Sequence, residues 1–180
     1  RELAAYPYRF GEVRQPTSHY LLFPSTSSEK RRYIPIGFME SDIISSNANL
    51  LIPDADLTDF AVLISNVHMG WMRTVAGRLK GDYRYSASIV YNNFPWPDLS
   101  ESTKEKLKMT GKQLIESRNL YPNWTLADLY DELTMPPELR KAHQDNDRAV
   151  MEAYGFNWRT MTESECVAEL MKMYQDLSKA

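Results

Sequence analysis

Residues 92–97, Asn-Asn-Phe-Pro-Trp-Pro, place two prolines around a tryptophan in the middle of the chain. Proline lacks a backbone N–H and fixes φ, so neither a helix nor a central strand can run through this segment. Short apolar runs separated by turns come before it, and residues with helical periodicity come after it. We therefore expect a domain boundary at Pro97–Asp98, which divides the chain into residues 1–97 and 98–180.

The first part has the pattern of a small sheet. Apolar and β-branched residues at 20–23 and 31–38 flank the polar stretch 25–30, an arrangement that favours a hairpin. Pro35 cannot donate a ladder hydrogen bond, so its strand is expected at an edge or at a bulge.

Two further strands and a helix are expected next. Short strands are predicted at 43–44 and 50–52. Apolar residues at three- and four-residue spacing then predict one helix, capped by Asp56 or Thr58 and stopped at Gly77. Residues 1–97 should therefore form a small mixed or antiparallel sheet with a packed helix.

The second part has helical periodicity throughout. Ser100 is a suitable N-cap, and Thr162 with Glu165 has the spacing of a capping box. Four helices joined by short connections are predicted, near residues 100–118, 126–133, 138–154 and from 162 onward. Such an arrangement indicates an all-α helical bundle, so the whole chain is expected to be an α+β protein.

Composition excludes several classes of protein. The chain has 180 residues, 43% hydrophobic and 25% charged, as in a globular protein and unlike a disordered tail or a collagen-like repeat. No apolar run approaches the roughly 20 residues of a membrane-spanning helix, so no membrane association is expected. A single cysteine, Cys166, suits a reducing compartment. A start at Arg1, without an initiator methionine or a signal peptide, leads us to expect a piece of a longer chain.

The charge distribution limits how the chain could bind nucleic acid. The formal net charge is −3, residues 1–97 are nearly neutral, and the acidic excess lies in residues 98–180. Neither part approaches the pI above about 9 that is typical of binding by bulk charge. Any DNA contact must therefore come from a local cluster of residues.

No catalytic machinery is evident. His19, His68 and His143 lie far apart in the sequence, no Cys/His spacing suits zinc, and no glycine-rich nucleotide loop occurs. His68 and Cys166 both lie on apolar helix faces and are interpreted as packed residues. We expect neither a catalytic residue nor a metal site in this chain, and the absence of partner residues disfavours a small hydrolase that uses His68.

The segment Arg78–Tyr85 is the most informative. If it is extended, Lys80, Asp82 and Arg84 project to one face, with Arg78 on the same face. A solvated loop would be equally charged. However, Lys or Arg can donate to guanine O6 and N7, and Asp can accept from the cytosine N4 amine. Lys80 and Asp82 could therefore hold one G·C pair between them.

The tyrosines alternate with these charged residues. In the same extended conformation, Tyr83 and Tyr85 would point to the opposite face and fix the strand against the core. Gly81 permits a close approach of the backbone or a bulge.

Four motifs carry a resemblance to a known family. The stretches Tyr33–Phe38, Met69–Lys80, Asp82–Ser86 and Tyr91–Pro97 resemble, in this order, the target-recognition domain of MmeI-like enzymes. These enzymes are single-chain restriction-modification proteins that methylate the N6 of adenine in DNA. The resemblance covers about Pro16–Pro97, and the helical remainder is similar to the C-terminal bundle of the family.

The resemblance implies which residues select bases. Lys80 and Asp82 correspond to partners for one base pair and resemble the combination that selects G. Ala48 and Arg84 correspond to a purine-reading pair, and Asn47 to a residue that reads a third position. Candidate contacts to the DNA backbone are the basic residues around these positions, namely Arg31, Arg32, Arg73 and Arg78, together with Arg9, Arg14 and Lys30.

The resemblance also implies what the rest of the enzyme supplies. S-adenosylmethionine would bind to an upstream methyltransferase domain of the same polypeptide, Mg²⁺ would serve a nuclease domain if one is present, and this fragment would hold no cofactor. The expected function is sequence-specific reading of double-stranded DNA in the major groove, in the cytoplasm of a prokaryote. The alternative is a protein–protein interaction or assembly module, with the tyrosines and Trp96 as its contact surface.

Overall fold

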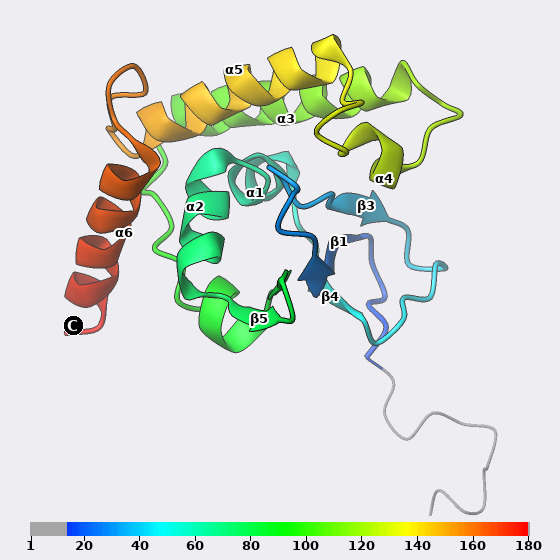
Figure 1. The fold of residues 1–180 in the computed structure, drawn as a ribbon, viewed down its shortest axis with the longest axis horizontal. Coiled ribbons are helices and arrows are strands. Elements are labelled where there is room, and N and C mark those ends of the chain that lie inside the picture. Colours follow the sequence, from blue (N-terminus) through cyan, green and yellow to red (C-terminus); the bar gives the residue numbers. More distant parts are fainter. Residues whose placement is uncertain (1–13, 180) are drawn as a thin grey trace, which may run out of the picture.

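The computed structural model describes residues 14–179, which form two small antiparallel sheets and a set of helices (Figure 1). One sheet has the strand order β3-β1-β4, and the other has the order β2-β6-β5. The strands of the first sheet are β1 (Tyr20–Pro24), β3 (Gly37–Met39) and β4 (Asn49–Pro53). Those of the second are β2 (Thr26–Ser27), β5 (Gly77–Leu79) and β6 (Asp82–Arg84).

The helices occupy the middle and the C-terminal half of the described chain. The first half contains α1 (Leu57–Leu63), α2 (Asn66–Val75) and the π-helix η2 (Ala87–Tyr91). The second half contains α3 (Glu101–Asn119), α4 (Leu126–Leu129), α5 (Pro137–Ala153) and α6 (Glu163–Leu177). The expected α+β class is confirmed. No helix within residues 14–179 is long and apolar enough to cross a membrane.

The predicted strands are only partly confirmed. Strand β1 pairs antiparallel with β3, an edge strand that begins after Pro35, and residues 50–52 lie in β4. Ile43 and Ile44 are not a strand: they lie in a turn region, 48% and 75% exposed, and no strand among residues 14–179 runs beside them. Two β-branched residues in sequence do not make a strand without such a partner.

The predicted single helix is two helices. Asp56 caps α1 through a capping box with Asp59, and α1 ends at Leu63. Ser65 then caps α2, accepting a hydrogen bond from the His68 N–H while its own hydroxyl donates to the Val62 carbonyl at 2.7 Å. Apolar periodicity continues through this break, so periodicity alone did not predict it. Likewise α2 ends at Val75, and Gly77 begins β5 instead of ending the helix.

The C-terminal half is helical, as predicted, but its helices pack on the first half as well as on each other. Helices α3 and α5 lie side by side and α1 packs against α3, whereas α6 packs against α2 (Figure 1). Ser100 caps α3, and Thr162 caps α6 through a capping box with Glu165, both as predicted.

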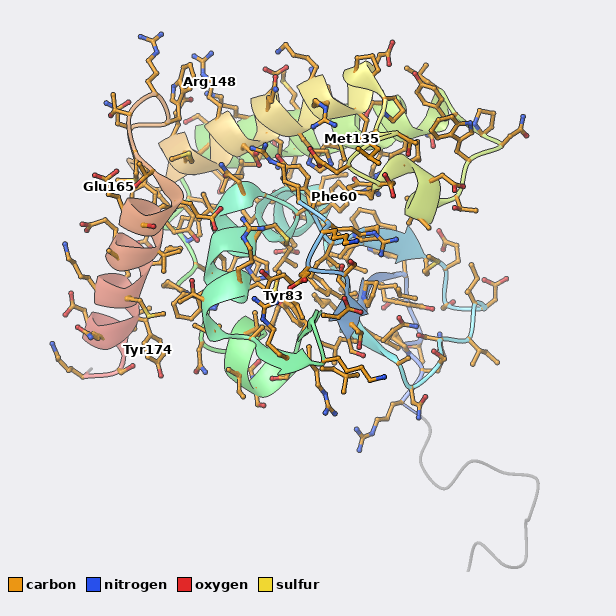
Figure 2. The ribbon with its side chains drawn as sticks, viewed as in Figure 1. Phe60, Tyr83, Met135, Arg148, Glu165 and Tyr174 are labelled. Atoms are coloured by element: carbon orange, nitrogen blue, oxygen red, sulfur yellow. The ribbon has the colours of Figure 1, made fainter. Side chains whose placement is uncertain are left out.

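One hydrophobic core joins the two parts. Phe60 of α1 lies beneath α3 and α5 (Figure 2), and it is fully buried, as are Leu107 of α3 and Leu139 of α5. A Cβ added at Gly111 of α3 would lie 2.8 Å from the Leu57 carbonyl oxygen, so the two helices touch at their backbones.

Polar contacts also cross the predicted boundary. The Asn146 side-chain amide donates to the Ala61 carbonyl at 2.8 Å. The Asp147 carboxylate accepts from the Tyr33 hydroxyl at 2.6 Å and from the Asn66 backbone N–H at 2.7 Å. Because buried polar groups need partners, these contacts make each part necessary to the other.

Asp147 should make stability depend on pH. Burial raises the pKa of its carboxyl to about 6, above the value near 3.9 expected in the unfolded chain. The folded protein therefore binds the proton more tightly, and this stabilising contribution is present at acid pH and is lost as the pH rises from about 4 to 6. Since Asp147→Asn cannot titrate, its stability relative to wild type should improve by roughly 2–3 kcal/mol between pH 4 and pH 7.

Denaturant unfolding of both proteins at pH 4, 5, 6 and 7 measures this difference. Asp145→Asn, on the same helix but with its carboxylate 44% exposed and paired with Lys141, is the matched control, since it also replaces one carboxylate by an amide. Parallel stability curves for wild type and Asp147→Asn would contradict the expectation.

Candidate nucleic-acid interface

Strands β5 and β6 form a hairpin whose inner side is fixed to the core. Leu79 pairs with Asp82 across the two-residue turn Lys80–Gly81. Tyr83 and Tyr85 are 7% and 3% exposed, and Tyr83 lies inside the molecule (Figure 2). The Tyr85 hydroxyl lies 2.9 Å from His68 Nε2, which is also buried. The two tyrosines therefore fix the hairpin, as the sequence predicted.

The outer side of the hairpin is open and carries charge. Residues directly opposite in an antiparallel pair share a face, so the cross-strand pairs define one outer surface. We call this surface the hairpin face; it consists of Thr26, Gly77, Leu79, Asp82 and Arg84, with Lys80 at the tip.

The charged side chains of the hairpin face and its tip are not paired with other described residues. Lys80 and Arg84 are exposed and Asp82 is half-buried. Among the contacts within residues 14–179, none is a hydrogen bond or ion pair to the side chains of these three residues. The outward projection of Asp82 and Arg84 is confirmed. All three charged groups are available to a ligand.

Arg78 does not lie on this face, contrary to the prediction. It pairs with Tyr83, and its guanidinium lies 3.9 Å from the centre of the Tyr83 ring. The same guanidinium donates to Glu29 at 3.2 Å and to the Gly81 carbonyl at 2.8 Å. The turn between the strands interrupts the two-residue alternation, so alternation counted along the sequence gave the wrong side.

Lys80 is not extended either. Its φ is 57°, in the left-handed region that favours glycine. A lysine there costs roughly 1–2 kcal/mol of backbone strain. Strained residues of this kind cluster at ligand-binding sites, and Lys80 is exposed in the turn at the tip of the hairpin.

The loop that holds Asn47 and Ala48 lies beside the hairpin. The Ala48 carbonyl accepts from the Ser25 N–H at 3.0 Å and from the Ser25 hydroxyl at 2.7 Å. The Ser25 carbonyl in turn accepts from the Tyr85 N–H at 2.8 Å, next to Arg84. The structure thus brings together the two predicted partners Ala48 and Arg84, and Asn47 is exposed in the same turn.

Ser25 joins the two segments, and nothing in the sequence marks it as a residue of the site. It lies between β1 and β2, where the chain crosses from one sheet to the other, and no local motif indicates that crossing.

The basic residues that were predicted to contact the DNA backbone differ in the partners that they have within the protein. Arg73 donates to both carboxylate oxygens of Glu163, at 3.0 and 2.6 Å, and to the Arg32 carbonyl at 3.2 Å. Arg73 therefore ties α2 to α6, and Arg78 is held by Glu29. In contrast, the side chains of Lys30 and Arg31 have no hydrogen bond or ion pair within the described residues. Arg14 is exposed, and Arg9 lies outside the described residues.

Nothing in the described chain resembles a catalytic centre. Burial lowers the pKa of His68 to about 3 and raises the pKa of Cys166 to about 11, so one stays neutral and the other a thiol. Both are packed residues, as predicted. No group of three or more His, Cys, Asp or Glu residues within 14–179 could hold a metal ion. The proposed protein-contact surface is also largely occupied, because Trp96 is half-buried and packs edge-on to Tyr91 and Phe94.

Comparison with known proteins agrees with the resemblance inferred from the motifs. DNA methyltransferase A of Bacillus subtilis (strain 168) is 39% identical over 178 residues, which are 99% of this chain and 20% of that protein. A solved structure of the Type IIL restriction-modification enzyme MmeI in complex with DNA is 46% identical, with a TM-score of 0.94 over all of this chain and 24% of that one. This chain therefore spans about a fifth to a quarter of the length of these relatives.

Family models match the chain from end to end. The target recognition domain of MmeI matches residues 1–98, and the C-terminal domain of MmeI matches residues 99–180. The chain therefore belongs to the MmeI family, with the target recognition domain followed by the C-terminal domain.

Proposed function

We propose that this chain is the sequence-recognition module of an S-adenosylmethionine-dependent DNA adenine-N6 methyltransferase of the restriction-modification type. The observation that carries the proposal is the hairpin face. There Lys80, Asp82 and Arg84 project outward from a hairpin anchored by buried tyrosines, and their side chains have no hydrogen bond or ion pair to any other described residue. A rigid two-stranded ribbon of this width fits the major groove of B-DNA. The similar MmeI structure, which is a complex with DNA, supports the proposal.

Each charged group has a base edge that suits it. Lys80 donates to O6 and N7 of a guanine, and Asp82 accepts from N4 of the paired cytosine. Arg84, with the small Ala48 beside it, donates to a purine N7, which is an acceptor in both adenine and guanine. Asn47, exposed in the neighbouring turn, reads a third position.

We assign the contacts to phosphate to the cations whose side chains have no hydrogen bond or ion pair within residues 14–179. These cations are Lys30 and Arg31. Arg32 adds a third positive charge to the same loop, and its guanidinium already lies 5.6 Å from the centre of the Tyr33 ring. Arg73 and Arg78 are held by carboxylates in this structure, so we assign them to the fold. A pI near 5.7 means that most of the affinity, which comes from phosphate contacts, is supplied by other parts of the protein.

The rest of the reaction is assigned to the rest of the protein. We infer that a methyltransferase domain of the same polypeptide binds S-adenosylmethionine, that any nuclease domain uses Mg²⁺, and that this chain holds no cofactor. The substrate is double-stranded DNA in a bacterial cytoplasm. The division of the chain at Pro97–Asp98 is proposed as a functional boundary between base reading and helical support.

Arg84→Ala tests the proposal in the full-length protein. The side chain is exposed and makes no hydrogen bond or ion pair within residues 14–179, so the melting temperature should stay within about a degree of wild type. Discrimination at one base pair should fall by about 1–3 kcal/mol, because the contact to purine N7 is lost. Affinities for duplexes that differ at one base pair at a time measure the change.

Arg73→Ala is the matched control, since it also removes one guanidinium. It should lower stability by about 1–2 kcal/mol through the loss of its bonds to Glu163, while the order of preferred sequences stays the same. If Arg84→Ala lowered the melting temperature strongly and left the sequence preference unchanged, Arg84 would be a structural residue and the proposal would fail.

A further inference from the structure

An apolar side chain occupies the hairpin face among the charged ones. Leu79 is directly opposite Asp82, so both project from the same side of the hairpin. It is 52% exposed, and within the described residues it belongs neither to the hydrophobic core nor to the apolar side chains packed against it. Packing therefore does not explain a leucine at this position.

The neighbours of Leu79 define what it can reach. Lys80 follows it at the tip, and Arg84 lies diagonally across, opposite Gly77. Because Gly77 has no side chain and a Cβ there would meet nothing within 4 Å, the space beside Leu79 is open. Opposite Cβ atoms in an antiparallel pair are about 4.5–5.5 Å apart, whereas stacked bases are about 3.4 Å apart. Leu79 is therefore within reach of the base pair next to the one that Asp82 holds.

The chemistry of the major groove offers one strongly apolar group. It is the methyl group on C5 of thymine, at a position where cytosine carries only hydrogen. A leucine side chain gains from burying that methyl group and gains nothing from a hydrogen-bonding edge. An apolar side chain that lies between two charged, base-reading side chains therefore favours a base that carries a C5-methyl group.

We propose that Leu79 is a specificity-determining residue that contacts the C5-methyl group of a pyrimidine in the base pair next to the one held by Lys80 and Asp82. This inference rests on the proposed function. The contact makes binding sensitive to C5 methylation: a thymine is favoured at this position, and a cytosine there is bound better when it carries a 5-methyl group.

The test uses the full-length protein and duplexes altered at single C5 positions. The recognition sequence is first identified by sequencing methylated bases, and the pair read by Lys80 and Asp82 is located with the variants described in the Discussion. In each neighbouring pair, thymine is then replaced by uracil, or cytosine by 5-methylcytosine. Fluorescence anisotropy gives the affinity of wild type, Leu79→Ala and Ile89→Ala for each duplex.

At one neighbouring pair the methyl group should strengthen wild-type binding about fourfold, the value expected for burial of one methyl group. Leu79→Ala should bind the methylated and unmethylated duplexes alike. Ile89→Ala, which removes a side chain that is 50% exposed on η2 and outside the hairpin face, should keep the wild-type response.

Three results would overturn the inference: no response of wild type to the methyl group, weaker binding when it is present, or an unchanged response in Leu79→Ala. These results are distinct from failure of the proposed function. That failure would appear as equal affinity of the wild-type protein for its recognition sequence and for a scrambled duplex.

Discussion

A full-length protein with Lys80→Glu and Asp82→Arg is expected to prefer C·G where the wild-type protein prefers G·C. The carboxylate then accepts from the cytosine N4 amine, and the guanidinium donates to guanine O6 and N7 from the other side of the hairpin turn. Each exchanged contact is worth about 1–3 kcal/mol, so the double variant should change the preference for this pair by roughly 2–6 kcal/mol. Sequencing of methylated bases in cells that carry each protein measures the preference.

Each single variant is informative as a control. Lys80→Glu alone places two acceptors at the pair and should weaken binding to both orientations. Lys80→Gly removes the contact and relieves the left-handed strain at φ 57°, so it should relax the choice without loss of stability. If the double variant kept the wild-type methylation sequence, Lys80 and Asp82 would not be the residues that read this pair.

Residues 1–97 alone are expected not to fold. Removal of residues 98–180 exposes the face of α1 that packs on α3, and it leaves the Ala61 carbonyl and the Asn66 N–H without the partners that they have in α5. Because a domain is normally stable by only about 5–15 kcal/mol, the loss of this burial and of these hydrogen bonds should prevent folding. Circular dichroism and two-dimensional NMR of the fragment should show no cooperative unfolding transition and poor dispersion of amide signals.

The intact chain of residues 1–180 is the reference for this experiment. Adding the separate fragment 98–180 should restore a cooperative transition, because the two fragments share one core. A fragment 1–97 that melted cooperatively, within a few degrees of the intact chain, would contradict this account of the fold. In that case the functional boundary would also be a folding boundary.

The sequence predicted the hairpin better than its turn. Alternation of Asp82 and Arg84 with Tyr83 and Tyr85 gave the correct faces, because these residues are in one strand or directly after it. Arg78 was assigned to the wrong face and Lys80 to an extended conformation, since the turn changes the alternation. A turn whose first central residue is lysine carries little of the usual Asn-Gly or Gly signal.

The remaining differences come from tertiary structure. The break at Ser65 lies within a continuous apolar pattern, and only the hydroxyl contacts of that serine mark it. Ser25 joins the Ala48 turn to the hairpin through contacts between residues far apart in the sequence. Arg73, which was predicted to contact phosphate, instead donates to Glu163, 90 residues away. It therefore connects two helices. Pairings at such distances leave no local pattern in a single sequence.

The most direct test of base reading by the hairpin face replaces the guanine opposite Lys80 with 7-deazaguanine. This change removes the N7 acceptor from the major groove and leaves base pairing intact. Wild-type affinity should fall about fivefold or more, and the affinity of the Lys80→Ala variant, which no longer makes the contact, should stay the same. An equal loss of affinity in both proteins, or in neither, would show that Lys80 does not contact this base.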